Sequence, residues 1–308
     1  MAHSTKKIVS GILLLNKSPG MTSHSAVSQA KRLFMSADFD SKKAGHTGTL
    51  DPMATGLLPI CFGEATKLSS FGLDADKTYR ATIQLGRKTD TGDKEGQVID
   101  KKDVLSFNQS DLDALANVFL GEQMQVPPMY SALKQNGKKL YELAREGITV
   151  ERLPRQINIH QLILQKISGD EIKMQTTCSK GTYIRVLAES IAEKLGTLGH
   201  LTTLERIKTG GFKIDDALTL DELSALSFQQ RLDVLLPVDT LVKHLPKIDL
   251  TNEQAIRVRL GQRLNSYQIL NKAPTHEQLV RLYNRELFLG MARIYPEGRL
   301  QPIRILAF

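Results

Sequence analysis

A single carboxylate stands in a glycine-rich stretch that favours a loop. Asp51 lies between Leu50 and Pro52 in the sequence GHTGTLDPMATGLLPICFGEATK, residues 45–67. Glycine-rich loops often cradle phosphate, but the spacing G-x-x-x-x-G-K-[ST] of that loop is absent here. Taken alone, an Asp-Pro pair among glycines is more simply a turn former whose side chain accepts backbone hydrogen bonds. A catalytic interpretation of Asp51 therefore needs support from other parts of the chain.

The sequence favours chemistry that uses no metal and no other cofactor. The seven histidines are scattered, without an H-x-x-x-H or C-x-x-C companion of the kind that binds zinc. Cys61 and Cys178 are the only cysteines, and both stand beside apolar residues. We therefore expect two buried thiols rather than a disulfide, and no metal, nucleotide or redox cofactor.

Composition predicts a folded protein with an anionic partner. The chain has 308 residues, 41% of them hydrophobic, and a net charge of +8. No apolar run approaches the length of a membrane span, and residues 1–7 lack a signal-peptide cleavage pattern, so we expect a cytoplasmic protein. The positive charge favours a phosphate-rich partner. Residues 251–308 hold nine Lys or Arg and four Glu, which predicts a basic module.

Hydrophobic periodicity predicts the elements that would position these residues. An apolar strand at residues 11–15 leads into a turn, and strict alternation at residues 77–85 predicts a half-buried strand. Residues 172–178 also alternate as a strand. They precede a helix at residues 184–195 that Gly196 would close.

Capping residues predict where two further helices begin. Ser23 or Ser25 would cap a helix that follows the first turn, and Ser110 would cap a second one. Gly121 stands where a left-handed carboxyl-terminal cap would fall.

The rest of the chain predicts an excursion, a linker and a small domain. Residues 125–155 are rich in Lys, Tyr and Pro but poor in aliphatic periodicity, which indicates a long excursion from the core without a buried face. Residues 237–246, bounded by prolines, would be a linker. A helix at residues 254–264 and a strand at residues 287–294 would belong to a separate small domain.

Five blocks, in order, resemble the TruB family of pseudouridine synthases. They are LLLNKSPGMTS (13–23), GHTGTLDPMATGLLP (45–59), KTYRATIQLGRKTDTGDKEG (77–96), VPPMYSALKQNGKKLYELAREG (126–147) and CSKGTYIRVLAESIAEKLG (178–196). Asn16 and Ser18 depart from the family pattern in the first turn, and neither lies in the loop of Asp51.

The resemblance implies three catalytic residues. Asp51 would be the nucleophile, Tyr79 would stack on the target base, and Arg185 would pair with Asp51. Isomerisation of uridine requires a positioned carboxylate and no cofactor, in agreement with the composition. By pattern alone Tyr79 would be a core residue, and Arg185 would form a surface pair with Glu189, four residues on.

The resemblance also implies residues that bind the substrate. His46 would contact the T-loop of tRNA, and Tyr183 and Leu204 would line the uridine pocket. Spacing does not distinguish Tyr183 and Leu204 from core residues, whereas a histidine among glycines is expected to be exposed. Residues 125–155 would form a thumb that closes over the T-arm, with aromatic side chains among lysines.

The predicted architecture is α/β (α+β). The resemblance implies a catalytic domain with a mixed, largely antiparallel sheet at residues 1–245. It also implies a small β-rich, PUA-like RNA-binding domain at residues 246–308, mainly from LFLGMARI and GRLQPIRIL. The implied reaction converts uridine 55 of tRNA to pseudouridine after base flipping. The alternative is a non-catalytic tRNA-binding or tRNA-folding protein on the same fold. A glycosidase-type hydrolase fits less well, because it generally needs two carboxylates and the loop supplies one.

Overall fold

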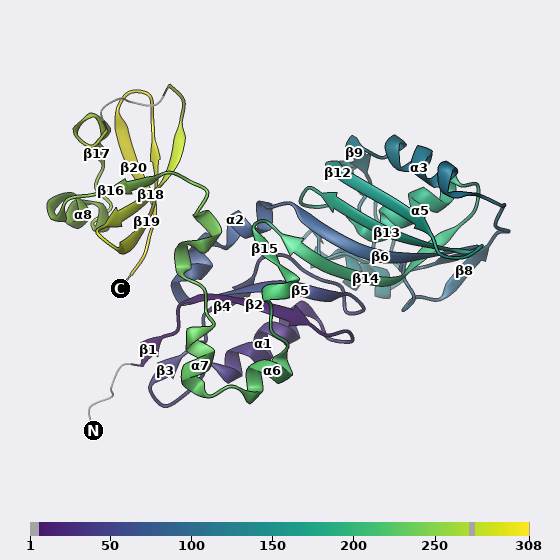
Figure 1. The fold of residues 1–308 in the computed structure, drawn as a ribbon, viewed down its shortest axis with the longest axis horizontal. Helices are drawn as coiled ribbons and strands as arrows, with labels where there is room; N and C mark the ends of the chain where they lie inside the picture. Colours follow the sequence, from purple (N-terminus) through teal and green to yellow (C-terminus); the bar gives the residue numbers. More distant parts are fainter. Residues whose placement is uncertain (1–5, 271–274, 308) are drawn as a thin grey trace.

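The computed structural model describes residues 6–270 and 275–307, and within them two main β-sheets (Figure 1). The larger sheet has the order β2-β5-β14-β6-β13-β12-β9, with β4 beside β5 and β15 beside β14. Its strands are β2 (Gly11–Lys17), β4 (Ala44–His46), β5 (Thr55–Phe62), β6 (Lys77–Leu85), β9 (Gly121–Gln125), β12 (Arg155–Lys166), β13 (Glu171–Cys178), β14 (Gly199–Thr209) and β15 (Phe212–Lys213). All these pairs are antiparallel except β5 with β14. The predicted mixed, largely antiparallel α/β fold is confirmed.

The strands predicted from alternation are confirmed. Strand β6 has the predicted bounds, and Tyr79, Ala81, Ile83 and Leu85 on one of its faces are buried. Strand β13 begins one residue before the predicted segment, and β2 extends two residues beyond it. Both cysteine thiols are buried and unpaired, as expected.

Helices cover the sheet, and two of their predicted caps are wrong. They are α1 (Ser23–Leu33), α2 (Ser69–Asp74), α3 (Gln109–Val118), α5 (Ile184–Lys194), α6 (Leu220–Ala225) and α7 (Phe228–Asp233). Thr22 caps α1 by accepting from the Ser25 amide, because the Ser23 hydroxyl is bound to Leu50 instead. Asn108, rather than Ser110, caps α3.

Short segments complete the body of the protein. They are β1 (Lys7–Ile8), β3 (Phe39–Asp40), β7 (Arg87–Thr89), β8 (Val98–Lys101) and the 3-10 helices η1 (Gly63–Leu68) and η2 (Ile214–Asp216). No helix among the described residues is long and apolar enough to cross a membrane. Residues 1–5 belong to the segment 1–7 that was searched for a signal-peptide cleavage pattern, and they lie outside the described residues.

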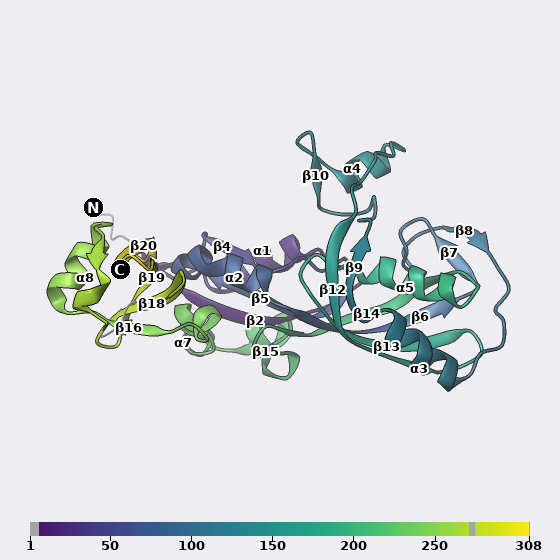
Figure 2. The same cartoon turned by 90° about the horizontal axis from the view of Figure 1, so that it is seen from above.

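Residues 125–155 project from the sheet as a small structured unit (Figure 2). Strands β10 (Lys134–Gln135) and β11 (Lys138–Lys139) form a two-residue hairpin, followed by α4 (Leu140–Arg145). The turn residues Asn136 and Gly137 both have positive φ, as this type of hairpin requires. Leu140 and Leu143 are buried, so the expectation of a segment without a buried face is wrong.

The carboxyl-terminal part forms a second, five-stranded sheet among the described residues. It comprises β16 (Lys247–Asp249), β17 (Leu264–Asn265), β18 (Gln278–Asn284), β19 (Leu287–Ile294) and β20 (Arg299–Ile305), with α8 (Asn252–Arg259) and the 3-10 helix η4 (Ser266–Gln268). The predicted strand at residues 287–294 is confirmed. The predicted helix ends earlier, because Gly261 adopts a left-handed conformation and Leu264 already begins β17.

Residues 237–246 connect the two sheets, as the predicted linker would, but they are packed between them. They contain the 3-10 helix η3 (Val238–Val242). Leu241 and Val242 belong to a hydrophobic cluster that joins Ile12 and Leu57 of the larger sheet to Phe288 of the smaller one. The proline pair marked a change of direction in the chain, and the apolar residues between the prolines made it a packed connection.

Candidate active site

Residues 47–54 form the loop that carries Asp51, between β4 and β5. Leu50 is buried, its amide donates to the Ser23 hydroxyl at 2.8 Å, and that hydroxyl donates to the Leu50 carbonyl at 3.0 Å. The Ala54 amide donates to the Asp51 carbonyl at 3.1 Å, which closes a tight turn. The backbone on both sides of Asp51 is therefore fixed.

Lys17 holds this loop to the amino-terminal turn. Its side chain is buried, and its Nζ donates to the carbonyls of Ser18, Met21 and Pro52 at 3.0, 2.8 and 3.2 Å. Burial lowers the pKa of Lys17 to about 8, although Asp51 opposes the shift. The amide of Gly20 also donates to the Pro52 carbonyl. The departure of this turn from the family pattern thus leaves its support of the loop intact.

Arg185 lies in the first turn of α5 and pairs with Asp51. Its Nε is 2.9 Å from Asp51 Oδ2, and its side chain is 5% exposed. Its Nη1 donates to the Thr91 carbonyl at 2.6 Å and its Nη2 to the Tyr130 carbonyl at 2.8 Å. One guanidinium therefore joins the carboxylate to two other segments. The alternative of a surface pair with Glu189 is wrong.

Asp93 is a second, buried carboxylate beside this pair. Its Oδ2 lies 3.7 Å from Arg185 Nε, and its Oδ1 accepts from the Thr91 hydroxyl and the Glu95 amide. Burial raises the pKa of Asp51 above its ordinary value; Arg185 opposes this shift and Asp93 adds to it. The Asp51 carboxylate, 35% exposed, is therefore the accessible member of a guanidinium–dicarboxylate group.

A cavity of about 310 Å³ opens in front of Asp51. Its walls include Tyr79, Tyr183 and Leu204, and residues 131–133 at the base of the projecting segment complete it. The structure thus brings together five of the six residues singled out from the sequence. His46 does not line this cavity.

Tyr79 and Leu204 reach the cavity from neighbouring strands. Tyr79 on β6 is paired in register with Arg206 on β14, and Leu204 lies two residues earlier on β14. Both side chains belong to the main hydrophobic cluster and also line the cavity. Each is therefore a core residue and a pocket residue. Burial raises the pKa of Tyr79, and the Arg206 guanidinium opposes that shift.

Tyr183, the residue before α5, is fixed by a side chain from edge strand β9. Its amide donates to the Gln125 Oε1 at 2.8 Å, and the Gln125 Nε2 donates to its carbonyl at 3.1 Å. Gln125 is buried at the end of β9, where the projecting segment begins. The pocket wall and the root of the projection are therefore one structural unit.

His46 ends β4, at the start of the same loop, and is half-buried rather than exposed as predicted. Its Nδ1 accepts from the Gly48 amide at 3.3 Å. Burial lowers the pKa of His46, and Arg206 and His24 add to that effect. The ring is consequently neutral at neutral pH, so it offers hydrogen bonds rather than charge.

Comparison with known proteins decides the family. Residues 36–184 match the family described as TruB family pseudouridylate synthase (N terminal domain), residues 185–243 match the tRNA pseudouridylate synthase B C-terminal domain, and residues 246–306 match Pseudouridine synthase II TruB, C-terminal. The chain belongs to the TruB family of pseudouridylate synthases. It is thus an enzyme of the isomerase class.

Individual relatives are similar over most of the chain. The tRNA pseudouridine synthase B of Psychrobacter arcticus is 56% identical over 263 residues, which cover 85% of this chain and 69% of that protein. The protein of the same name from Chromohalobacter salexigens is 46% identical over 298 residues, 97% of this chain and 94% of that protein.

Solved structures share the fold at low sequence identity. A chain of a Cbf5-Nop10-Gar1 complex has a TM-score of 0.70 and 24% identity, covering 94% of this chain and 80% of its own. A chain of an H/ACA RNP bound to a substrate RNA containing 2′-deoxyuridine has a TM-score of 0.71 and 21% identity, covering 98% and 86%. These likenesses show the fold of this TruB-family chain.

Sequence reasoning missed four charged residues of this site, Lys17, Lys77, Asp93 and Arg206, all of which are buried. Lys77 donates to the carbonyls of Gly72, Leu73 and Ala75 at the end of α2. Lys17 and Lys77 stand in or beside segments that the sequence predicted to be structured. No element was predicted at Asp93 or Arg206, so the pattern gave no signal for these two charges.

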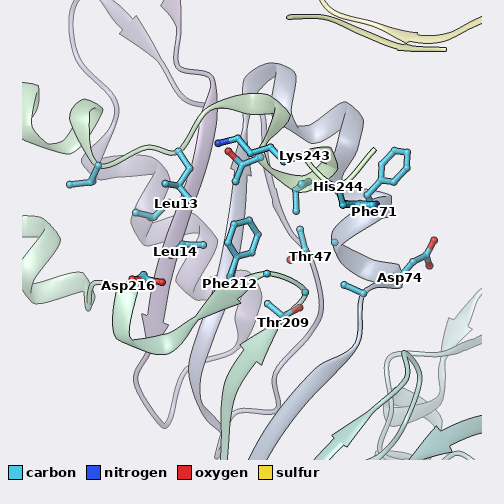
Figure 3. Close-up of a pocket in the computed structure, with 18 of the residues that line it drawn as sticks. Leu13, Leu14, Thr47, Phe71, Asp74, Thr209, Phe212, Asp216, Lys243 and His244 are labelled. Carbon is cyan, nitrogen blue, oxygen red and sulfur yellow. The ribbon is translucent and has the colours of Figure 1, made fainter. Parts of the chain in front are cut away.

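A larger cavity of about 900 Å³ lies elsewhere, between β2, α2 and η3 (Figure 3). Its walls are mainly apolar and include Leu13, Phe71 and Phe212. Its carboxylates, Asp74 and Asp216, are exposed. This cavity is the larger of the two, but the smaller one contains the paired Asp51 carboxylate and Arg185 guanidinium.

Proposed function

We propose that this enzyme converts uridine 55 in the T-loop of tRNA to pseudouridine, with Asp51 as the nucleophile. The observation that carries the proposal is the Asp51 carboxylate, paired with Arg185 at 2.9 Å at the wall of a cavity lined by two tyrosines. The family is that of pseudouridylate synthases, and the relatives named above act on tRNA by their names. The proposed substrate also fits the net charge of +8.

The reaction exchanges one glycosidic bond for another. The target uridine must first leave the stack of the T-loop, at a cost of about a few kcal/mol that contacts in the cavity offset. The bond from ribose C1′ to N1 then breaks, a bond from C1′ to C5 forms, and the C5 proton leaves. Asp51 serves this reaction by attack on C1′ or on C6. A third route, through a glycal, needs a base at C2′, for which Tyr79 is the candidate.

The remaining residues would hold the flipped base. Tyr79 would stack on it, Tyr183 and Leu204 would close the sides of the pocket, and His46 would contact the T-loop outside the cavity. The half-buried, neutral ring of His46 supports a hydrogen-bonding rather than a charge-pairing role. Lys17 and Ser23 hold the loop, so the Asp51 carboxylate would already be oriented toward the bound uridine. No conformational entropy would then be lost in placing it during the reaction.

We further propose a division of labour along the chain. Residues 1–245 would form the catalytic domain, with residues 125–155 as the thumb, and residues 246–308 would form a PUA-like RNA-binding domain. The separate five-stranded sheet supports this division. We place the enzyme in the cytoplasm, with its proposed tRNA substrate.

The direct test uses the purified protein and tRNA transcripts. We expect pseudouridine at position 55, detected by chemical mapping of the modified position, and no product in a transcript with cytidine at that position. Modification at another position would contradict the assigned uridine. Tight tRNA binding without any pseudouridine would favour the non-catalytic alternative, a tRNA-binding or tRNA-folding protein.

The thumb gives a prediction for limited proteolysis. We expect trypsin to cut the free protein after Lys138 or Lys139, because this hairpin projects from the sheet and local opening exposes it. A T-arm RNA should protect both bonds. Lys101, the last residue of β8, and Lys102 are both exposed and provide an internal control whose cleavage should not change. Equal cutting of the hairpin with and without RNA would show that the segment does not close on the substrate.

The carboxyl-terminal domain gives a prediction for the salt dependence of binding. Arg257, Arg259 and Arg263 are exposed, at or just after the end of α8, and none pairs with a carboxylate that the structure describes. Replacing all three by Gln should weaken tRNA binding and reduce the slope of log K against log salt by about 0.7 to 0.9 for each phosphate that the variant no longer binds. Turnover at saturating tRNA should survive.

Substitution is a better test here than deletion of the domain. Removing residues 251–308 would also remove Phe288 and Leu306, which pack against the catalytic body. Arg293→Gln is the matched control, because this guanidinium already pairs with Glu277 at 2.8 Å. An unchanged slope in the triple variant would refute the proposed role of these charges. Lys272, which was counted in the basic module, lies outside the described residues.

A further inference from the structure

Arg206 occupies a junction of three strands beneath the active site. On β14 it is paired in register with Gly56 of β5 on one side and with Tyr79 of β6 on the other. A Cβ at position 56 would lie 2.4 Å from the Arg206 carbonyl oxygen, so the two strands meet at a distance that only glycine permits. The Arg206 side chain is 1% exposed.

The Arg206 guanidinium joins the two ends of the loop that carries Asp51. Its Nε donates to the Leu57 carbonyl at 2.8 Å, after the loop. Its Nη2 donates to the Gly48 carbonyl at 3.0 Å, before Asp51. These bonds span the loop from a single rigid, planar group.

The same group acts on Tyr79. Residues in register on neighbouring strands present their side chains to the same face of a sheet. The positive charge of Arg206 stabilises the ionised form of Tyr79, which opposes the rise of the Tyr79 pKa caused by burial. Arg206 therefore interacts, through the backbone or through its charge, with both residues assigned to the reaction.

Packing of the strand junction does not by itself explain why a charged side chain, Arg206, is buried there. No carboxylate pairs with Arg206 in the part of the chain that the structure describes. Burying a guanidinium without an opposite charge is costly, and an apolar side chain of similar volume would fill the junction at lower cost.

We propose that Arg206 is a positioning residue, which fixes the loop of Asp51 and the ring of Tyr79 in one arrangement relative to the bound uridine. This inference rests on the proposed function. The geometry sets Arg206 apart from Arg185, since Arg206 holds the backbone at the two ends of the loop and Arg185 holds the carboxylate itself.

The test compares Arg206→Met and Arg206→Lys with a matched control. The Arg231 guanidinium also donates hydrogen bonds to backbone carbonyls, those of Leu33, Leu223 and Ser224. Arg231 lies on α7, outside the cavity. Arg231→Met therefore measures the general effect of losing such an arginine. Each variant is measured for melting temperature, tRNA affinity, and single-turnover release of tritium from C5-labelled uridine.

We expect Arg206→Met to react at least about tenfold more slowly than wild type, with tRNA affinity within about threefold, because misplaced groups lose rate rather than binding. Arg206→Lys should recover part of the rate, since it keeps the charge and reaches one carbonyl. Arg231→Met should keep the wild-type rate.

Three results would overturn the proposal: a folded Arg206→Met variant with the wild-type rate, equal rate losses at positions 206 and 231, or loss of folding in both Arg206 variants, which would make Arg206 purely structural. Failure of the proposed isomerisation itself is distinguishable, because wild type would then release no tritium.

Discussion

Asp51→Asn should abolish pseudouridine formation while leaving tRNA binding almost intact. The amide keeps the volume of the carboxylate but is a very poor nucleophile, and loss of a covalent nucleophile in other enzymes costs on the order of a millionfold in turnover. Binding should change little, because the proposed contacts of the thumb and of His46 lie away from the reacting bond. The paired measurement is tRNA retention on filters and single-turnover tritium release from C5-labelled uridine.

A matched control separates chemistry from the simple loss of a negative charge. Asp100→Asn makes the same change at an exposed residue of β8, and the variant should react at the wild-type rate. Near-normal isomerisation by Asp51→Asn, with normal binding, would show that Asp51 is not the nucleophile. Joint loss of binding and folding would instead favour the interpretation of Asp51 as a turn former, because Asp51 lies in the turn that the Ala54 amide closes.

Local pattern was sufficient for the regular elements and insufficient where a side chain has a distant partner. The alternation at residues 77–85 gave the bounds of β6, because burial alternates with a period of two from Tyr79 to Leu85. Ser23 has the right type and position for a cap, yet its hydroxyl binds Leu50, 27 residues away. The neighbouring Thr22 caps the helix instead.

The composition of the site shows the same limit. Spacing along the helix pointed Arg185 to Glu189, whereas its partner is Asp51, far away in sequence. Only the family resemblance indicated that pair before the structure was known. Asp93 and Arg206 had no such indication, because a buried charge is recognised by what surrounds it in space. Tyr79 could be placed on the buried face of a strand, but the wall of a pocket and the core of a sheet share that pattern.

Arg185→Met should lower the single-turnover rate on the order of a hundredfold to a thousandfold, the loss measured when a preorganised donor is removed from an active site. The variant loses the ion pair to Asp51 and the bonds to Thr91 and Tyr130. It also removes the guanidinium that lies within 4 Å of both Asp51 and Asp93. Arg185→Lys keeps the charge but cannot reach all three partners, so it should recover only part of the rate.

The pH dependence tests the electrostatic part of this role. As the proposed nucleophile, Asp51 must be ionised to react, so the rate should fall as the pH drops through the Asp51 pKa. Burial already raises that pKa, Arg185 opposes the shift, and its removal must therefore raise the pKa further. In Arg185→Met the acid limb of the rate profile should move to higher pH, and in Arg185→Lys it should lie between that of Arg185→Met and that of wild type.

Arg281 supplies the matched control for loss of a buried ion pair. It pairs with Asp239 at 3.3 Å, the two side chains are 14% and 13% exposed, and the pair lies between η3 and the smaller sheet. Arg281→Met should lower the melting temperature, because it leaves a shielded carboxylate without its partner, and should leave the acid limb at saturating tRNA unchanged. If the acid limb of Arg185→Met coincides with that of wild type while the rate falls, Arg185 serves only to join Thr91 and Tyr130 to the loop. If it moves upward as expected, the guanidinium also helps to keep the proposed nucleophile ionised, because it offsets the rise of the Asp51 pKa that burial causes.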